Sequence, residues 1–254
     1  NTIRLLSTFI IVFFFIFYVG AQFNGAGEKI VPIFGFDPVW GQIVAAVVIL
    51  AYAAFGGFIS VVAVDTFQSL LIITTLVVTP VIMLVHVLDQ PTGFGEALAA
   101  AGPGFDSLTG TTVGFAAGLL IFNKFAWFFG YLGGQPQLNA RFMGMRDDRN
   151  VRIGRNIAVI WTILAYAGVV IIGLCALVLY GPHAVQDSES ILPFVINKLF
   201  PWWLAGILLA GAAAAMISTA QSMLLVAAAS ISQDVFKGAI RRGQVDDKTV
   251  LTIS

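Results

Sequence analysis

The sequence predicts an all-α polytopic membrane protein with six transmembrane helices. Of its 254 residues, 59% are hydrophobic and only 10% are charged, whereas a soluble domain carries about 25% charged residues. So few charges cannot cover a surface that faces water, and the bilayer must therefore be the solvent. Six apolar stretches have the length of about 20 residues that a helix needs to cross the hydrocarbon core, and they do not alternate like β-barrel strands. They are residues 4–23, 40–62, 66–88, 113–135, 157–180 and 202–231.

Charge and chemistry exclude several classes of function. The formal net charge is zero, so nucleic acid is not an expected partner. The single cysteine, Cys175, cannot form an internal disulfide, and His86 and His183 form no cluster of metal ligands. Because no nucleophile–base arrangement and no phosphate loop stand out, we expect neither an enzyme nor an organic cofactor. The chain begins at Asn1 rather than at a methionine, and we expect it to be the middle of a longer protein.

The first three helices offer two candidate residues. Tyr18, in the first helix, fits either an interfacial aromatic or a cavity residue. A short connection at residues 63–66 is expected to separate the second and third helices at the cytoplasmic face. Asp65 in that connection would be either an N-cap of the third helix or a cation ligand. Pro80 is expected to kink the third helix, with neighbouring groups satisfying the freed carbonyl.

The fourth helix ends in Gly133, Gly134, Gln135 and Pro136. Glycine and proline open the backbone, and unpaired carbonyls at membrane depth are tolerated only against protein or a watery cavity. Interrupted helices of this kind mark substrate and ion sites in secondary transporters, while close packing on small residues is the alternative. We expect the four residues to form a helix break, or gate.

The same helix carries a lysine inside the span, where a charge costs at least about 2.5 kcal/mol on insertion scales. Lys124, Trp127 and Tyr131 lie at i, i+3 and i+7, which places them on one helical face. This face suits a small solute with a carboxylate or a polar head. In the alternative interpretation Lys124 extends outward to the membrane surface, and the two aromatic side chains form a packing layer.

The sixth helix contains the adjacent hydroxyls of Ser218 and Thr219. Hydroxyl and carbonyl oxygens can replace the hydration shell of an alkali cation. The pattern alone favours a simpler interpretation, in which these side chains bond back to a carbonyl one turn earlier or pack between helices.

Lysine and arginine positions predict the orientation. The segment after the fourth helix carries five arginines, the tail after the sixth helix carries four basic residues, and the loop 89–112 carries none. By the positive-inside rule, residues 136–156 and 232–254 are therefore cytoplasmic, and the chain begins on the cytoplasmic side.

Three motifs in one register resemble the sodium:solute symporter family. Residues 54–68, AFGGFISVVAVDTFQ, resemble the signature around the family's fifth and sixth helices. Residues 130–143 are similar to the seventh helix of its sodium/proline symporters, and residues 205–236 are similar to its ninth helix. The resemblance implies that residues 1–254 are a single transmembrane domain made of family helices four to nine. It also implies a leucine-transporter-type bundle, a five-plus-five inverted repeat that works by alternating access.

The same resemblance implies sodium-coupled symport of a small polar solute, proline or a related amino acid or carboxylate, across the plasma (inner) membrane. Sodium would be held by the carbonyl of Ala215 and the hydroxyls of Ser218 and Thr219, with Asp65 linked to sodium dependence. The remaining ligands would come from helices of the same protein that this chain lacks. Trp127, Tyr131 and Tyr18 match residues linked to substrate binding. Two features depart from the family pattern. Lys124 is not expected in this helix, and the stretch from Tyr131 to Arg141 is one residue longer than in the best-known proline symporter. Both bear on the identity of the solute and not on the fold.

Two alternatives stay open. Symporter-like membrane modules also occur fused to signalling kinases, where sensing outweighs transport, and the sequence after Ser254 would discriminate the two. A sodium-independent carrier, with Lys124 in place of a cation, ranks last, because Lys124 and the predicted sodium ligands lie on different helices.

Overall fold

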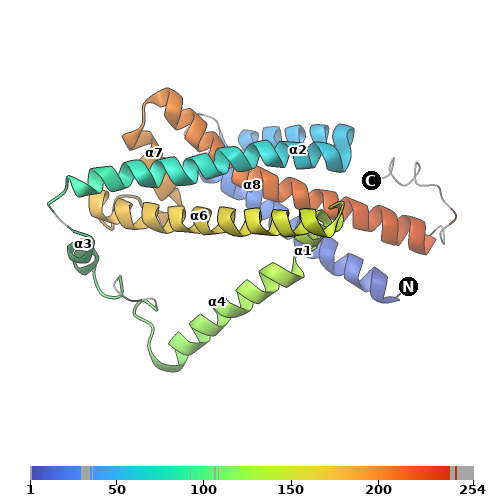
Figure 1. The fold of residues 1–254 in the computed structure, drawn as a ribbon, viewed down its shortest axis with the longest axis horizontal. Helices are drawn as coiled ribbons and strands as arrows, with labels where there is room; N and C mark the ends of the chain where they lie inside the picture. Colours follow the sequence, from blue (N-terminus) through green and yellow to red (C-terminus); the bar gives the residue numbers. More distant parts are fainter. Residues whose placement is uncertain are drawn as a thin grey trace. The chain divides into compact units, whose positions relative to one another are not determined.

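The computed structural model describes residues 2–29, 35, 37–91, 93–105, 107, 109–240 and 244 (Figure 1). Within these residues the regular structure is helical throughout, which confirms the predicted all-α class. The helices are α1 (Thr2–Lys29), α2 (Pro38–Leu88), α3 (Phe94–Ala101), α4 (Gly114–Gly134), α5 (Pro136–Met143), α6 (Asp148–Tyr180), α7 (Ile191–Leu199) and α8 (Trp202–Ser230), with a 3-10 turn η2 (Ser188–Ser190) and a π-helical segment η3 (Ile231–Ile240).

Four helical stretches of the described chain are long and apolar enough to cross a membrane. They are Thr2–Gly27, Ile59–Leu88, Asp148–Tyr180 and Trp202–Ile240. Val39–Ala51 and Gly114–Ala126 are apolar but shorter. The count of six spans and the inverted repeat stay predictions.

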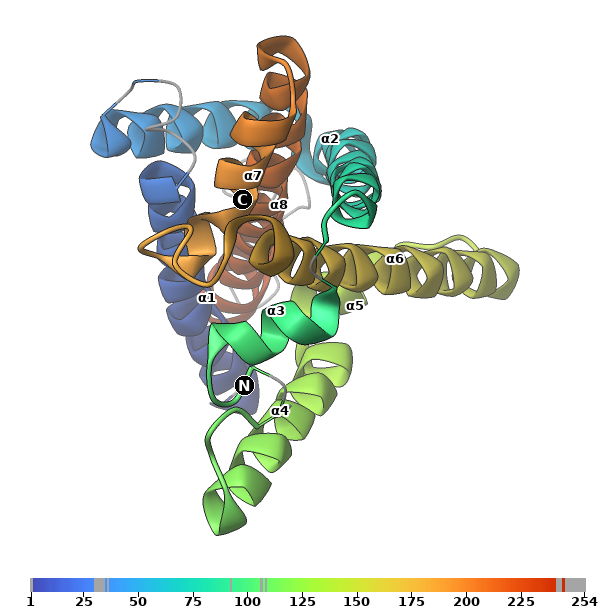
Figure 2. The ribbon, with the colours of Figure 1, turned by 90° about the vertical axis from the view of Figure 1, so that its left-hand side faces the viewer.

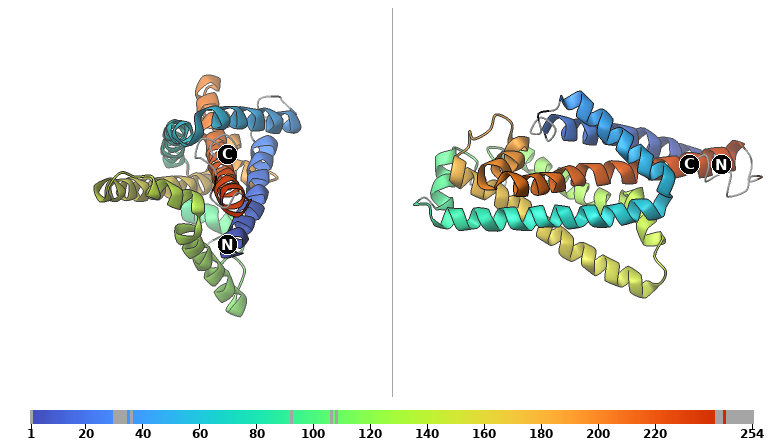
Figure 3. Two further views of the ribbon diagram at one scale, coloured as in Figure 1. Left: turned by 90° about the vertical axis from the view of Figure 1, so that its right-hand side faces the viewer. Right: turned by 90° about the horizontal axis from the view of Figure 1, so that it is seen from above.

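The chain groups into two compact units, one of Asn1–Ile72 with Ala210–Ser254 and one of Ile73–Leu209. In the first unit, α1 packs against the part of α8 that is drawn in red (Figure 3), through a cluster of five buried side chains. α1 contributes Phe15 and Val19, one turn apart, and α8 contributes Ala220, Met223 and Ala227. Phe9, Phe14 and Phe17 on the same helix are exposed, so α1 needs an apolar environment on its outer face too.

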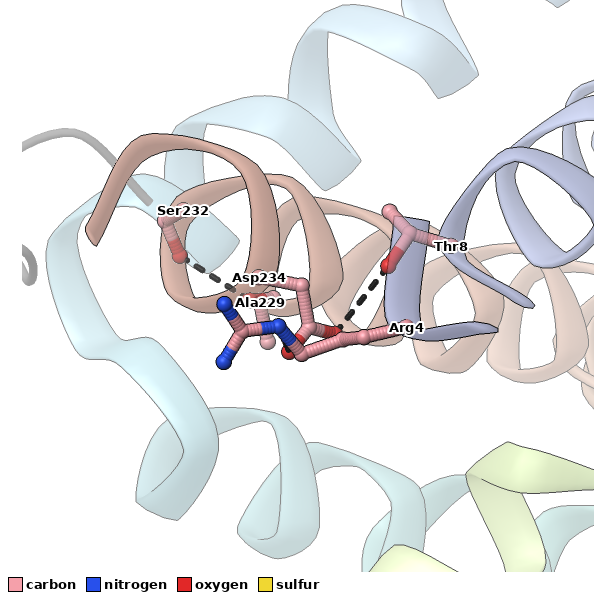
Figure 4. A network of polar contacts seen from close by, with 5 residues as sticks. All are labelled: Arg4, Thr8, Ala229, Ser232 and Asp234. Atoms are coloured by element: carbon pink, nitrogen blue, oxygen red, sulfur yellow. Dashed lines mark hydrogen bonds and ion pairs between the residues drawn. The ribbon is translucent and has the colours of Figure 1, made fainter. Parts of the chain in front are cut away.

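The ends of α1 and of η3 are joined by polar contacts in the same unit (Figure 4). Thr8 is 3% exposed and its hydroxyl donates to Asp234 Oδ2 at 3.1 Å, while the Arg4 guanidinium lies 3.7 Å from Asp234 Oδ1. A Cβ on Gly238 would touch that guanidinium. The absence of a side chain at Gly238 therefore leaves the room that Arg4 occupies.

In the second unit, the core lies between α2, α6 and α7. It consists of Met83, Val87, Ile172, Cys175, Ala176 and Val195. α3 and α7 both contact α6 (Figure 2). Pro80 lies inside α2 and has no N–H to offer the carbonyl of Leu76 four residues earlier. Gly168 of α6 comes so close to this carbonyl that a Cβ there would collide with it.

Two predicted boundaries differ from the structure. The expected connection at residues 63–66 is helical, and α2 runs without interruption from Pro38 to Leu88, although its ribbon changes direction in the cyan part of the chain (Figure 3). No glycine or proline interrupts these four residues, and the Thr66 hydroxyl bonds back to the Val62 carbonyl at 2.8 Å, as helical hydroxyls do. Asp65 therefore lies inside a helix and is not an N-cap.

The fifth predicted span also begins earlier than expected. α6 begins at Asp148 rather than near residue 157, because Asp147 accepts a hydrogen bond from the Asn150 N–H at 2.8 Å and caps the helix. The arginine-rich segment before the apolar stretch is thus helical as well.

Candidate functional site

Three predicted sodium ligands meet on one turn of α8, in the first unit. The carbonyl of Ala215 accepts hydrogen bonds from the Ser218 hydroxyl at 3.1 Å and from the Thr219 hydroxyl at 2.9 Å. These are the back-bonds that the simpler interpretation predicts. They do not exclude a cation, because each hydroxyl keeps two acceptor lone pairs and can rotate its hydrogen away. The turn therefore gathers one carbonyl and two hydroxyl oxygens, all hard ligands.

A second polar group lies one turn further along α8, where Asp65 of α2 meets it. The side-chain amide nitrogen of Gln221 donates to Asp65 Oδ1 in a short contact, and it lies 3.4 Å from Gln68 Oε1. The Ser222 hydroxyl lies 2.7 Å from the Ser218 carbonyl and 3.4 Å from Asp65 Oδ2. A hydroxyl has one hydrogen, so Ser222 serves the nearer acceptor and can turn to Asp65 when that bond breaks.

The members of this group on α8 are buried. Gln221 is 0% exposed, Ser222 is 7% exposed, and Asp65 is half-buried. The Gln221 carbonyl oxygen, Oε1, is buried without a hydrogen-bond partner. A carboxylate in such surroundings is stabilised by the donors that reach it, and Gln221 is the donor in closest contact.

Gln68, Gln221 and Ser222 are not among the site residues predicted from the sequence. A signal was present on α8, because Ser218, Gln221 and Ser222 lie at i, i+3 and i+4 and therefore on one face. On α2, Asp65 and Gln68 are likewise three residues apart. The pairing of these two faces cannot be predicted from the sequence, because the contact joins residues more than 150 positions apart.

The second unit contains a break between α4 and α5. α4 ends at Gly134, Gln135 has the extended angles φ −87° and ψ 106°, and α5 begins at Pro136. Proline suits the first helical position because it lacks the N–H that would have no partner there. Gln137 is 7% exposed, and its amide nitrogen donates to Gln135 Oε1 at 2.5 Å. Gln137 Oε1 is buried without a partner, so the break carries a free acceptor; its role as a gate stays a prediction.

The remaining candidate residues are placed as follows. Lys124 lies on α4 with an exposed side chain. Trp127, Tyr131 and Gly133 are part of the α4 helix, but their side chains and surroundings lie outside the described part of the chain. Tyr18 lies on α1 and is 39% exposed, and the contacts described for Asp65 and Ala215 do not include it. Their substrate roles stay predictions.

Comparison with known proteins places the chain in a family. The sodium:solute symporter family matches residues 1–254. The high-affinity proline transporter PutP of Bacillus subtilis is 31% identical over 250 residues, which are 98% of this chain and 52% of the relative. Sodium/proline symporter 2 of Staphylococcus saprophyticus is 30% identical over 239 residues, 93% of this chain and 45% of the relative. The osmoregulated proline transporter OpuE of Bacillus subtilis is 30% identical over 254 residues, 99% and 50%.

The chain thus spans about half the length of these curated relatives. No solved structure is significantly similar to it. The family assignment covers the whole chain and agrees with the resemblance found in the sequence motifs. The chain belongs to the sodium:solute symporter family.

Proposed function

We propose that the full-length protein is a sodium-coupled symporter of a small polar solute, proline or a related amino acid or carboxylate, that works by alternating access in the plasma (inner) membrane. The observation that carries this proposal is the convergence of the Ser218 and Thr219 hydroxyls on the Ala215 carbonyl. The relatives named as proline transporters support proline as the first solute to test.

Sodium takes the place of two hydrogen bonds in this proposal. When the ion arrives, the two hydroxyl hydrogens rotate away from the Ala215 carbonyl, and three oxygens become free to coordinate it. Three ligands are too few to replace the hydration shell of the ion, so helices outside this chain supply the others. Asp65, close to the same face of α8, adds negative charge that favours a cation.

The solute contacts α4 and the break that follows it. Lys124, Trp127 and Tyr131 share one helical face, with the ammonium of Lys124 available to a carboxylate and the aromatic rings to an apolar ring such as that of proline. Tyr18 of α1 is a further substrate-binding residue in this proposal. Gly133, Gly134, Gln135 and Pro136 act as the gate, since the helix is interrupted at Gln135. Sodium binding favours the outward-open state and raises solute affinity, and by reciprocity the solute raises sodium affinity.

The orientation of the proposal follows the arginines. Arg146, Arg149, Arg152 and Arg155 are exposed around the beginning of α6, so we place residues 136–156 and 232–254 in the cytoplasm.

Uptake of radiolabelled proline into proteoliposomes of the full-length protein tests the function. We expect uptake to depend on an inward sodium gradient and to stop when potassium replaces sodium. Replacing both Ser218 and Thr219 by alanine should raise the sodium concentration for half-maximal uptake at least about tenfold, because two ligands are lost. Uptake that ignores sodium refutes the coupling, and an unchanged sodium requirement in the double variant refutes the ligand assignment.

A further inference from the structure

The contact between Gln221 and Asp65 is asymmetric. The amide nitrogen of Gln221 is directed at the Asp65 carboxylate and lies within reach of Gln68 Oε1. The amide oxygen of the same group is buried and has no partner. An amide that is 0% exposed normally satisfies both ends, because an unpaired buried acceptor is costly. The orientation of Gln221 is therefore set by Asp65, strongly enough to outweigh the loss at the other end.

The side-chain N–H of Gln221 compensates the negative charge of Asp65, as a cation would. A carboxylate beside apolar helices needs compensation, either from a positive ion or from hydrogen-bond donors. Donor and cation are both drawn to the negative charge of this carboxylate, and the Gln221 N–H already occupies one of the lone pairs of Oδ1. Each therefore neutralises part of the charge that would attract the other.

We propose that Gln221 competes with sodium for Asp65. The amide neutralises part of the carboxylate charge, so sodium gains less at Asp65 than it would beside a carboxylate without this donor. This inference rests on the proposed function, since it concerns the sodium site that includes Asp65. Gln221 acts here as a positioning residue and not as a ligand.

The position of Ser222 supports the same interpretation. Its hydroxyl bonds to the Ser218 carbonyl at 2.7 Å and lies 3.4 Å from Asp65 Oδ2. It is thus a weak competitor at the second carboxylate oxygen, and Gln221 is the strong one. Because Ser218 belongs to the proposed sodium ligands, both donors to Asp65 lie beside the turn proposed to receive the ion.

The test is a gain of sodium affinity. Gln221→Met keeps the length and apolar volume of the side chain and removes the donor. In the purified full-length protein, we expect the apparent dissociation constant for sodium, obtained from the rise of Tm with sodium concentration, to fall about fivefold to tenfold, which is part of what a hydrogen bond to a charged group is worth. Choline replaces sodium at equal ionic strength as the reference, and the half-saturation for proline in uptake is measured in parallel. Damage to the fold would raise the sodium requirement, so a fall cannot come from damage.

Two further variants separate the outcomes. Gln221→Glu, which removes the donor and adds a negative charge, should lower the sodium half-saturation further than Gln221→Met, and it keeps the test open should the methionine variant not fold. In an Asp65→Asn background, Gln221→Met should not lower the sodium half-saturation, because the carboxylate for which Gln221 and sodium compete has been removed. An unchanged or raised sodium requirement in both Gln221 variants overturns the inference. If the wild type itself shows no response to sodium, the proposed function has failed instead.

Discussion

Replacing Gly168 by alanine is the sharpest test of the packing between α2 and α6. Pro80 leaves the Leu76 carbonyl without its helical hydrogen bond, and Gly168 of α6 packs directly on that carbonyl. A Cβ on Gly168 would collide with the Leu76 oxygen, and it would lie 3.0 Å from the Leu76 carbonyl carbon and 3.3 Å from the Leu76 Cβ. These atoms are backbone or rigidly attached to it, so α6 itself must move away.

The cost follows from three terms. Overpacking a tight contact costs about 1–3 kcal/mol, and loss of the close Cα–H···O contact costs about 0.5–1 kcal/mol. The better helix propensity of alanine returns up to about 1 kcal/mol. The net destabilisation lies within about 0.5–4 kcal/mol and centres on about 2 kcal/mol, which for a domain of this size lowers Tm by roughly 4–8 °C.

Thermal unfolding of the full-length protein in detergent, followed by fluorescence, measures this shift. Gly173→Ala is the matched control, because it lies on the same helix and a Cβ there meets nothing within 4 Å. We expect its Tm to stay within about 2 °C of wild type. If Gly168→Ala is as stable as Gly173→Ala, the close approach of α6 to the freed carbonyl is wrong.

Four further substitutions test three other contacts, each measured by the same unfolding assay. Thr75→Val removes the hydroxyl that donates to the Leu208 carbonyl at 2.9 Å in a buried position and should cost about 1 kcal/mol; a neutral result would show that this bond does not hold α2 to the start of α8. Thr8→Val removes the nearly buried donor to Asp234 and should cost about 1 kcal/mol. Arg4→Gln should cost less than about 0.5 kcal/mol, because the ion pair with Asp234 is 3.7 Å long and both side chains are partly exposed. A larger loss for Arg4→Gln than for Thr8→Val would contradict the view that the Thr8 hydrogen bond is the stronger contact. Gly238→Ala should be nearly neutral, within about 0.5 kcal/mol, although its Cβ would touch Arg4, because the guanidinium is the end of a flexible side chain and can swing aside; a loss as large as that of Gly168→Ala would mean that Arg4 is held rigidly.

The parts of the fold that depend on local chemistry can be predicted from the sequence. The helical class follows from composition, because apolar stretches in a bilayer must satisfy their backbone groups internally. The residues at the end of α4 are equally local, since Pro136 fits a first helical position and cannot continue a preceding helix. The early start of α6 was missed because the search followed hydropathy, whereas the cap at Asp147 extends the helix into a polar segment.

Asp65 shows where local reasoning ends. Its neighbour Thr66 resembles a capping residue, yet the helix continues through both because the hydroxyl of Thr66 is satisfied within α2. Whether Asp65 is a cap, a cation ligand or a structural carboxylate depends on which side chains of α8 face it. Hydropathy does not predict contacts between side chains of two helices. The structure supplies Gln221 and Ser222 as those partners.

The contacts on α8 also bear on how tightly the proposed site would bind sodium. The Ala215 carbonyl is engaged by two hydroxyls and the Asp65 carboxylate by the Gln221 amide. The proposed ligands on this chain are therefore already hydrogen-bonded. Each bond that the ion displaces would subtract about 1 kcal/mol or more from the gross coordination energy, which would moderate the affinity for sodium. A symporter needs this balance, because it must release its sodium on the side where the solute is delivered, and a site that held its ligands ready and unpaired would bind the ion too tightly to let it go.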